Sequence, residues 1–216
     1  MQTDYSVKSG RQALDYQYRH NANNTTRIDP ATTNIIDLYL VTQSYYTAYR
    51  NWIQDSTDTV TKPEQPTMNE LQISYPLIND YKMLSDSAVL NSVTFKPLFG
   101  AKADRSLRAT IKAVKSTSTN ASDSEIRSAI LKEMDVYFNI DNWNFGDTFF
   151  FSELSSYLHE KLGDMVSSVV LVSNDPEKLF GDLYEIKCRP YEIFANAATT
   201  NDVVIVAALT PDTLQS

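Results

Sequence analysis

The feature that most constrains this chain is a change in hydrophobic period between residues 106 and 137. The segment "SLRATIKAVK", residues 106–115, alternates apolar and polar side chains, which predicts a strand with one buried face. Its apolar side holds Leu107, Ala109, Ile111 and Ala113, and its polar side holds Arg108, Thr110 and Lys112. After the polar loop "STSTNAS", the spacing becomes helical, at Ile126, Ile130, Met134 and Tyr137. A strand and a helix that each have one apolar face must be covered by other elements.

Local signals also fix where several helices begin. Ser122 and Glu125 form a capping box at the start of the helix just described, and Thr67 and Glu70 form another further upstream. Pro76 interrupts that upstream helix, after which Leu77, Ile78, Tyr81 and Leu84 resume a helical stripe. Residues 45–53 favour a short helix. Ser152 is predicted to cap a helix over 153–162, which ends at Gly163.

Further strands are predicted on both sides of these helices. They cover residues 34–41, 92–99, 167–173, 182–195 and 203–209, with Pro97 confining the second to an edge or an end. In the run 182–195, alternation places Tyr184, Ile186 and Cys188 on one face. The order of elements predicts an α+β fold, with mixed sheet strands and packed helices.

Changes in composition divide the chain into three parts. Residues 1–28 are polar and are interpreted as a flexible arm or the cut edge of a longer chain. Residues 29–116 are expected to form a strand–helix–strand subdomain. Residues 117–216 are expected to form a second subdomain of two helices followed by strands.

Charge and hydropathy exclude several classes of partner. The 216 residues carry a formal net charge of −8, which disfavours non-specific binding to nucleic acid. No window approaches 18 apolar residues, and no apolar run follows the N-terminus, so neither a membrane span nor a signal peptide is expected. The one cysteine cannot form an internal disulfide or a Cys-based zinc site.

No catalytic, cofactor-binding or metal-binding residue is predicted. His20 and His159 are both interpreted as solvated, and Cys188 as a small buried residue on the inner face of its strand. A calcium loop starting at Asp141 would place Gly146 correctly, but it has Trp143 where an oxygen ligand is required. The acidic residues are scattered, so spacing alone does not indicate a carboxylate pair of the glycosidase type.

One segment is strongly basic. Between residues 96 and 115, six basic residues stand against a single acid, Asp104: Lys96, Lys102, Arg105, Arg108, Lys112 and Lys115. One interpretation is a solvated strand face. The other is a dock for an acidic patch on a partner or on a second copy of the chain, through Arg108 and Lys112.

The segment from "SLRATIKAVK" through "EIRSAILKEMDVYF" and "NFGDTFFFSEL" to "VSSVVLV" resembles the C-terminal part of baseplate J-like proteins of contractile phage tails. The stretches "NIIDLYLVTQSYY" and "VTFKPLFGAKADRSLRA" are similar to the larger baseplate wedge subunit of T-even-type phages. The likeness spans roughly residues 27–209, and it rests on an ordered pattern rather than a catalytic signature. Because such wedge subunits are much longer, the chain resembles only their C-terminal portion.

This resemblance implies a structural subunit of the tail baseplate, located in the virion and made in the host cytoplasm. Copies would pair as homodimers and form a ring around the hub beside other wedge subunits, and the ring would rearrange on host attachment. No enzyme activity or cofactor is implied. Two other classes stay open: a carbohydrate- or receptor-binding module of a virion, and an unrecognised hydrolase.

The aromatic stretch "NWNFGDTFFFSEL", residues 142–154, can be interpreted within this pattern. Gly146 tolerates the positive φ of a sharp turn. In an extended run, Phe149 and Phe151 would share one face and pack against Ile130, Met134 and Leu158, the inner stripes of two helices. Phe150 would lie opposite, either in a second layer or exposed for contact. Together with Arg108 and Lys112, Phe150 and Trp143 are the candidate interface residues.

Overall fold

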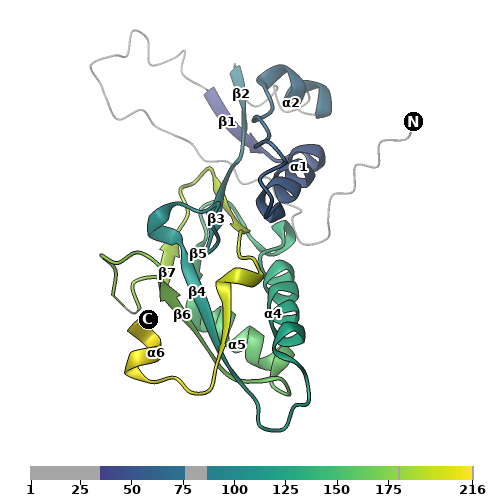
Figure 1. The fold of residues 1–216 in the computed structure, drawn as a ribbon. Coiled ribbons are helices and arrows are strands. Elements are labelled where there is room, and N and C mark those ends of the chain that lie inside the picture. The colour runs from purple at the N-terminus through teal and green to yellow at the C-terminus, as the bar shows by residue number, and fades with distance from the viewer. Residues whose placement is uncertain (1–34, 76–86, 180, 216) are drawn as a thin grey trace. The chain divides into compact units, whose positions relative to one another are not determined.

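A computed structural model describes residues 35–75, 87–179 and 181–215 and has the predicted α+β fold (Figure 1). The chain divides into two compact units. The first comprises Met1–Thr42 and Pro66–Ser92, and the second comprises Gln43–Gln65 and Val93–Ser216. The expected arm, residues 1–28, lies outside the described residues, as does the helical stripe predicted between Leu77 and Leu84.

The first unit is built on a pair of parallel strands. Strand β1 (Ile35–Leu40) pairs with β2 (Ser87–Ser92), and helix α2 (Met68–Ser74) supplies Leu71 to their shared core with Leu38 and Leu90. The capping box predicted at the start of α2 is confirmed. Its C-terminal neighbour Tyr75 donates a hydrogen bond of 2.6 Å from its hydroxyl to the Val41 carbonyl, which ties the end of α2 to the end of β1.

The described part of the second unit contains three small sheets. Strand β4 (Ala109–Lys115) lies between β6 (Val166–Ser173), which is antiparallel to it, and β9 (Val203–Val206), which is parallel. Strand β3 (Thr94–Leu98) runs parallel to β8 (Glu192–Asn196), and β5 (Thr148–Phe150) antiparallel to β7 (Glu185–Lys187). The prediction of mixed sheet strands is therefore confirmed.

Helices of the second unit cover these strands. They are α1 (Gln43–Gln54), α4 (Asp123–Tyr137), α5 (Phe151–Leu162) and α6 (Pro211–Gln215), with short 3-10 turns at Arg105–Leu107, Ile140–Asn142 and Thr200–Asp202. Helix α4 contacts both α5 and β9, and α5 contacts β6 (Figure 1). The inner stripe predicted for α4 is confirmed at Ile126, Ile130 and Met134, which are fully buried.

The predicted start of α5 is wrong. Its first residue is Phe151, and the residue in the N-cap position is Phe150, which provides no side-chain cap. Phe150 still pairs with Glu185 in the β5–β7 ladder, and the Phe151 amide donates to the Tyr184 carbonyl at 2.8 Å. The strand therefore leads directly into the helix, and Ser152 lies inside the helix rather than before it.

Several predicted strands also have different bounds. The run 203–209, for example, ends as a strand at Val206. The run 106–115 begins as a 3-10 turn, so β4 starts only at Ala109. The run 182–195 divides into β7 and β8, because the chain turns between them and each strand pairs with a different partner, β5 or β3. Tyr184 is consequently 51% exposed, whereas Ile186 and Cys188 are buried as predicted.

The division into units differs from the one expected at residue 116. Strands β3 and β4 belong to the second unit, because their hydrogen-bonded partners β8, β6 and β9 all follow residue 165. Helix α1 also belongs there. Pairing between distant strands therefore outweighs proximity in sequence, and residues 29–116 do not form one subdomain.

The turn between β3 and β4 has a constrained backbone. Phe99 has a φ of 78°, which is strained for a bulky residue, yet its side chain is fully buried. A Cβ on the next residue, Gly100, would lie 1.6 Å from the Ala197 carbonyl oxygen, so only glycine fits there. This close approach joins the end of β3 to the segment that follows β8.

Candidate interaction surface

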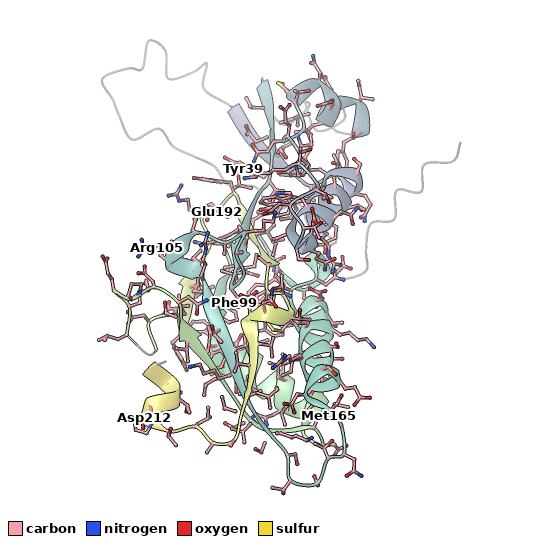
Figure 2. All side chains as sticks on the ribbon, in the orientation of Figure 1. Tyr39, Phe99, Arg105, Met165, Glu192 and Asp212 are labelled. Carbon is pink, nitrogen blue, oxygen red and sulfur yellow. The ribbon has the colours of Figure 1, made fainter. Side chains whose placement is uncertain are left out.

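The aromatic stretch 142–154 forms part of the interior of the second unit. Gly146 adopts a φ of 77°, which confirms the predicted turn. Beyond it, Phe149 is fully buried and contacts the ring of Phe99 at a centroid distance of 5.7 Å. Figure 2 shows Phe99 within the packed side chains of this unit. The surrounding rings belong to Phe138, Trp143 and Phe194.

The three consecutive phenylalanines have different environments. Phe149 points inward as predicted, and it meets the rings of Phe99 just after β3, Phe194 on β8 and Phe138 at the end of α4. Phe151 is the first residue of α5 and is only half-buried, so the prediction that it shares the inner face of Phe149 is wrong. Alternation ends at Phe150, since the extended run is only three residues long. Phe150 is also half-buried.

The four candidate interface residues do not lie on one surface. Trp143 is 7% exposed, stacks on Phe138 and donates from Nε1 to the Tyr137 carbonyl at 2.9 Å. Lys112 was expected on the polar side of its strand beside Arg108, but it is 4% exposed and its ammonium donates to the Thr213 carbonyl of α6. The prediction of a solvated Lys112 is therefore wrong, because α6 covers that face of β4.

Most of the basic segment is engaged inside the unit. Lys96 lies 3.7 Å from Glu192, Arg105 lies 3.9 Å from Asp175, and Lys102 pairs with Asp58. Figure 2 shows Arg105 at the surface of the unit. Arg108 is exposed, but its Nε donates to the Ala103 carbonyl at 3.0 Å. Five of the six basic residues therefore have an acidic or carbonyl partner within the unit, while Arg105 and Arg108 remain exposed.

A polar network fixes α1 against the rest of the second unit. The Asp135 carboxylate on α4 accepts hydrogen bonds from Gln54 at 2.9 Å and from Asn196 at 2.8 Å, and Arg50 lies 3.4 Å away. Because these partners come from α1 and β8, one carboxylate joins three elements. No local sequence pattern indicates this network, since its members lie far apart along the chain.

A hollow of about 310 Å³ opens beside α1. Its floor is formed by Tyr45, Tyr49 and Phe95, and Lys62, Pro63 and Glu64 are among the residues at its rim. The Tyr49 and Phe95 rings lie 4.5 Å apart, and burial raises the pKa of the Tyr49 hydroxyl well above its ordinary value. All three floor rings are at most 6% exposed, so they offer a bound molecule little open ring surface.

Residues with potential for chemistry are dispersed in the part of the chain that is described. Cys188 is 3% exposed, and burial raises the pKa of its thiol to about 12, so it is not a thiolate at neutral pH. His159 is exposed, as predicted, and His20 lies outside the described residues. Within residues 35–75, 87–179 and 181–215, no three His, Cys, Asp or Glu side chains are grouped to hold a metal.

The same described ranges contain no helix that is both long enough and apolar enough to cross a membrane. The sequence matches no protein-family model and no curated protein.

The edges of the β6–β4–β9 sheet are the surface that the sequence analysis missed. Among the described strands, β6 and β9 each pair only with β4. Neither edge strand contains a charged residue or a proline: β6 reads "VSSVVLVS" and β9 reads "VVIV". On β9, Val204 is 36% exposed and the two residues after it are half-exposed. Alternation and apolar content predicted these strands, but no local signal shows which strand lies at an edge.

Proposed function

We propose that the chain is a non-catalytic structural subunit of the tail baseplate wedge of a contractile-tailed phage. In this role it resides in the virion, pairs with a second copy and contacts other wedge proteins. The resulting ring surrounds the hub and rearranges on host attachment. The sequence pattern supports the proposal through its resemblance to baseplate J-like proteins over most of the chain.

The observation that carries the proposal is the pair of uncharged edge strands. Proteins that act alone usually protect sheet edges with charges, prolines, bulges or covering elements. The eight residues of β6 and the four residues of β9 include neither a charge nor a proline. Backbone groups at such edges are suited to pairing with a strand from another chain. An assembly subunit uses this property, whereas an enzyme acting as a monomer has no need of it.

The test is to locate the chain in phage particles. We expect an epitope tag on the chain to appear in purified contractile-tailed particles and to bind gold-labelled antibody at the tail end distal from the head. A control particle lacking the tag should remain unlabelled. If the tagged chain is found only in the unassembled fraction of infected cells, the proposed role in the tail is wrong.

The hollow beside α1 favours a second candidate, a carbohydrate- or receptor-binding module. Aromatic floors are common in ligand sites. The buried state of Tyr45, Tyr49 and Phe95 makes the hollow a poor platform for stacking a sugar ring. Chemical-shift changes at these three residues during titration with soluble glycans would support this alternative.

A further inference from the structure

We propose that residues 207–215, which include helix α6, form a strap that opens and closes over one face of the β6–β4–β9 sheet, with Lys112 as the residue that holds the strap closed. In the closed state, which the structure shows, Lys112 is 4% exposed and its ammonium donates to the Thr213 carbonyl of α6. In the open state, α6 leaves the sheet, and water reaches Lys112 and the valines beside it. This inference is independent of the proposed role in a phage tail.

The face of the sheet that carries Lys112 is apolar around this residue. Side chains alternate along β4, so the buried Ile111 points into the core and Lys112 points to the opposite face. The pairing register sets Lys112 between Val170 of β6 and Val204 of β9. An ammonium is costly to bury among apolar groups unless polar groups accept hydrogen bonds from it. The carbonyl of Thr213 meets this requirement while α6 lies on the sheet.

Helix α6 is too short to be stable by itself. It has five residues, Pro211–Gln215, and isolated helices shorter than about 12 residues are marginal in water. Its turn is closed locally, because the Leu214 amide donates to the Thr210 carbonyl at 3.0 Å and the Thr210 amide donates to Thr213 Oγ1 at 2.8 Å. These bonds join residues of the strap to one another. The position of the strap on the sheet therefore depends on contacts such as the hydrogen bond from Lys112.

Lys112 meets α6 at the end of the helix where a cation is favourable. Thr213 lies in the last turn of α6, where carbonyl groups have no partner within the helix and a lysine can supply one. A hydrogen bond from a charged donor is stronger than one between neutral groups. Loss of the Lys112 ammonium should therefore shift the strap toward the open state.

Other features of the strap make opening inexpensive. Ala207 and Ala208, which connect β9 to the rest of the strap, are exposed. The apolar side chains of Leu209 and Leu214 are only half-buried, so little apolar area is lost to water when the strap leaves the sheet. Segments with few buried apolar contacts open locally at a lower free-energy cost than the core.

The first experiment removes the ammonium and keeps the apolar stem. Lys112→Met retains a long side chain between Val170 and Val204 but cannot donate to the strap. We expect the Leu214 amide hydrogen, followed by NMR, to exchange with solvent deuterium at least about tenfold faster than in wild type, because this exchange requires the strap to open. Exchange of amides in the middle of α4, which requires opening of the core, should change far less.

The matched control is Lys132→Met, at an exposed lysine on α4, which should leave the exchange of the Leu214 amide unchanged. Two outcomes overturn the proposal. One is a Lys112→Met variant in which the Leu214 amide exchanges no faster than in wild type. The other is a wild-type Leu214 amide that already exchanges as fast as in an unstructured peptide, which would mean that Lys112 holds nothing closed.

The second experiment asks whether opening uncovers the apolar face. We expect Lys112→Met to bind the dye anilinonaphthalene sulfonate, which reports exposed apolar surface, more strongly than wild type and Lys132→Met do. Adding Val170→Thr to Lys112→Met should reduce this binding, because Val170 belongs to the uncovered face. Faster exchange of the Leu214 amide without increased dye binding would overturn the claim that the strap covers an apolar face.

Discussion

The two helices that pack together in the second unit begin in different ways. Helix α4 starts at a capping box, in which Glu125 Oε2 accepts from the Ser122 amide at 2.7 Å and Ser122 Oγ accepts from the Glu125 amide at 3.3 Å. Helix α5 has no side-chain cap, and its start is fixed by the pairing of Phe150 with Glu185. Four neighbouring residues determine where α4 starts. The start of α5 is determined by strand β7, which lies more than thirty residues away along the chain. Sequence patterns detect only the first kind.

The largest expected effect tests the start of α5, which depends on pairing with the distant strand β7. Phe149→Ala removes a fully buried ring between β5 and the aromatic residues around it, and should lower the free energy of unfolding by about 3–5 kcal/mol. Phe151→Ala should cost less than half as much, because that side chain is half-buried. Denaturant unfolding of both variants provides the measurement. Equal losses would show that the triplet acts as one core element, and would remove the distinction between the two residues.

A smaller effect compares the two serines directly. Ser122→Ala deletes one half of the capping box and should lower the free energy of unfolding by about 1 kcal/mol. Ser152→Ala changes an exposed serine inside the first turn of α5, and should shift stability by less than about 0.5 kcal/mol. Thermal and denaturant unfolding can resolve the difference. A loss at Ser152 as large as that at Ser122 would mean that α5 also depends on a local cap.

The smallest effect is the pH dependence of the stability that the capping carboxylate of α4 contributes. Hydrogen bonds from the backbone and side chain of Ser122 lower the pKa of Glu125 below its ordinary value of 4.5. The carboxylate therefore stabilises the folded chain at pH values above its unfolded pKa, and this contribution is lost as the pH falls through the lowered folded pKa. Glu125→Gln should lower the melting temperature slightly at pH 7 and no longer do so in strong acid.

The matched variant for this pH test is Glu153→Gln, in the first turn of α5, where no capping box exists. At pH 7, the melting temperature of Glu153→Gln should differ less from that of wild type than the melting temperature of Glu125→Gln does. If the Glu125→Gln difference persists unchanged into strong acid, the capping carboxylate is not its cause.

Local patterns were sufficient for the secondary structure of much of this chain. Helix α4, the capping box at Thr67, strand β6 and the turn at Gly146 all follow from residues within a few positions of one another. The sequence also indicated the burial of Cys188 correctly. In each case the signal is a period or a capping residue, and both act over about one helical turn.

The remaining features depend on contacts that no local pattern reports. The burial of Lys112 requires α6, which lies about a hundred residues away along the chain. The requirement for glycine at position 100 comes from the carbonyl of Ala197. Asp135 looked like one of many surface acids on α4, yet it joins α1 to β8. Which strands lie at the edges of the sheet is likewise set by topology.

The parallel pairing of β4 with β9 has a consequence for biosynthesis. A ribosome adds about 5–20 residues each second, so β4 and β6 emerge and can pair well before β9 exists. During that interval the side of β4 that β9 later occupies, from Ile111 to Val114, is open to other nascent strands. On a polysome, neighbouring ribosomes on one message would hold the nascent chains, and with them these open sides of β4, close together. The residues of β9 must therefore be translated before this side of β4 can be covered.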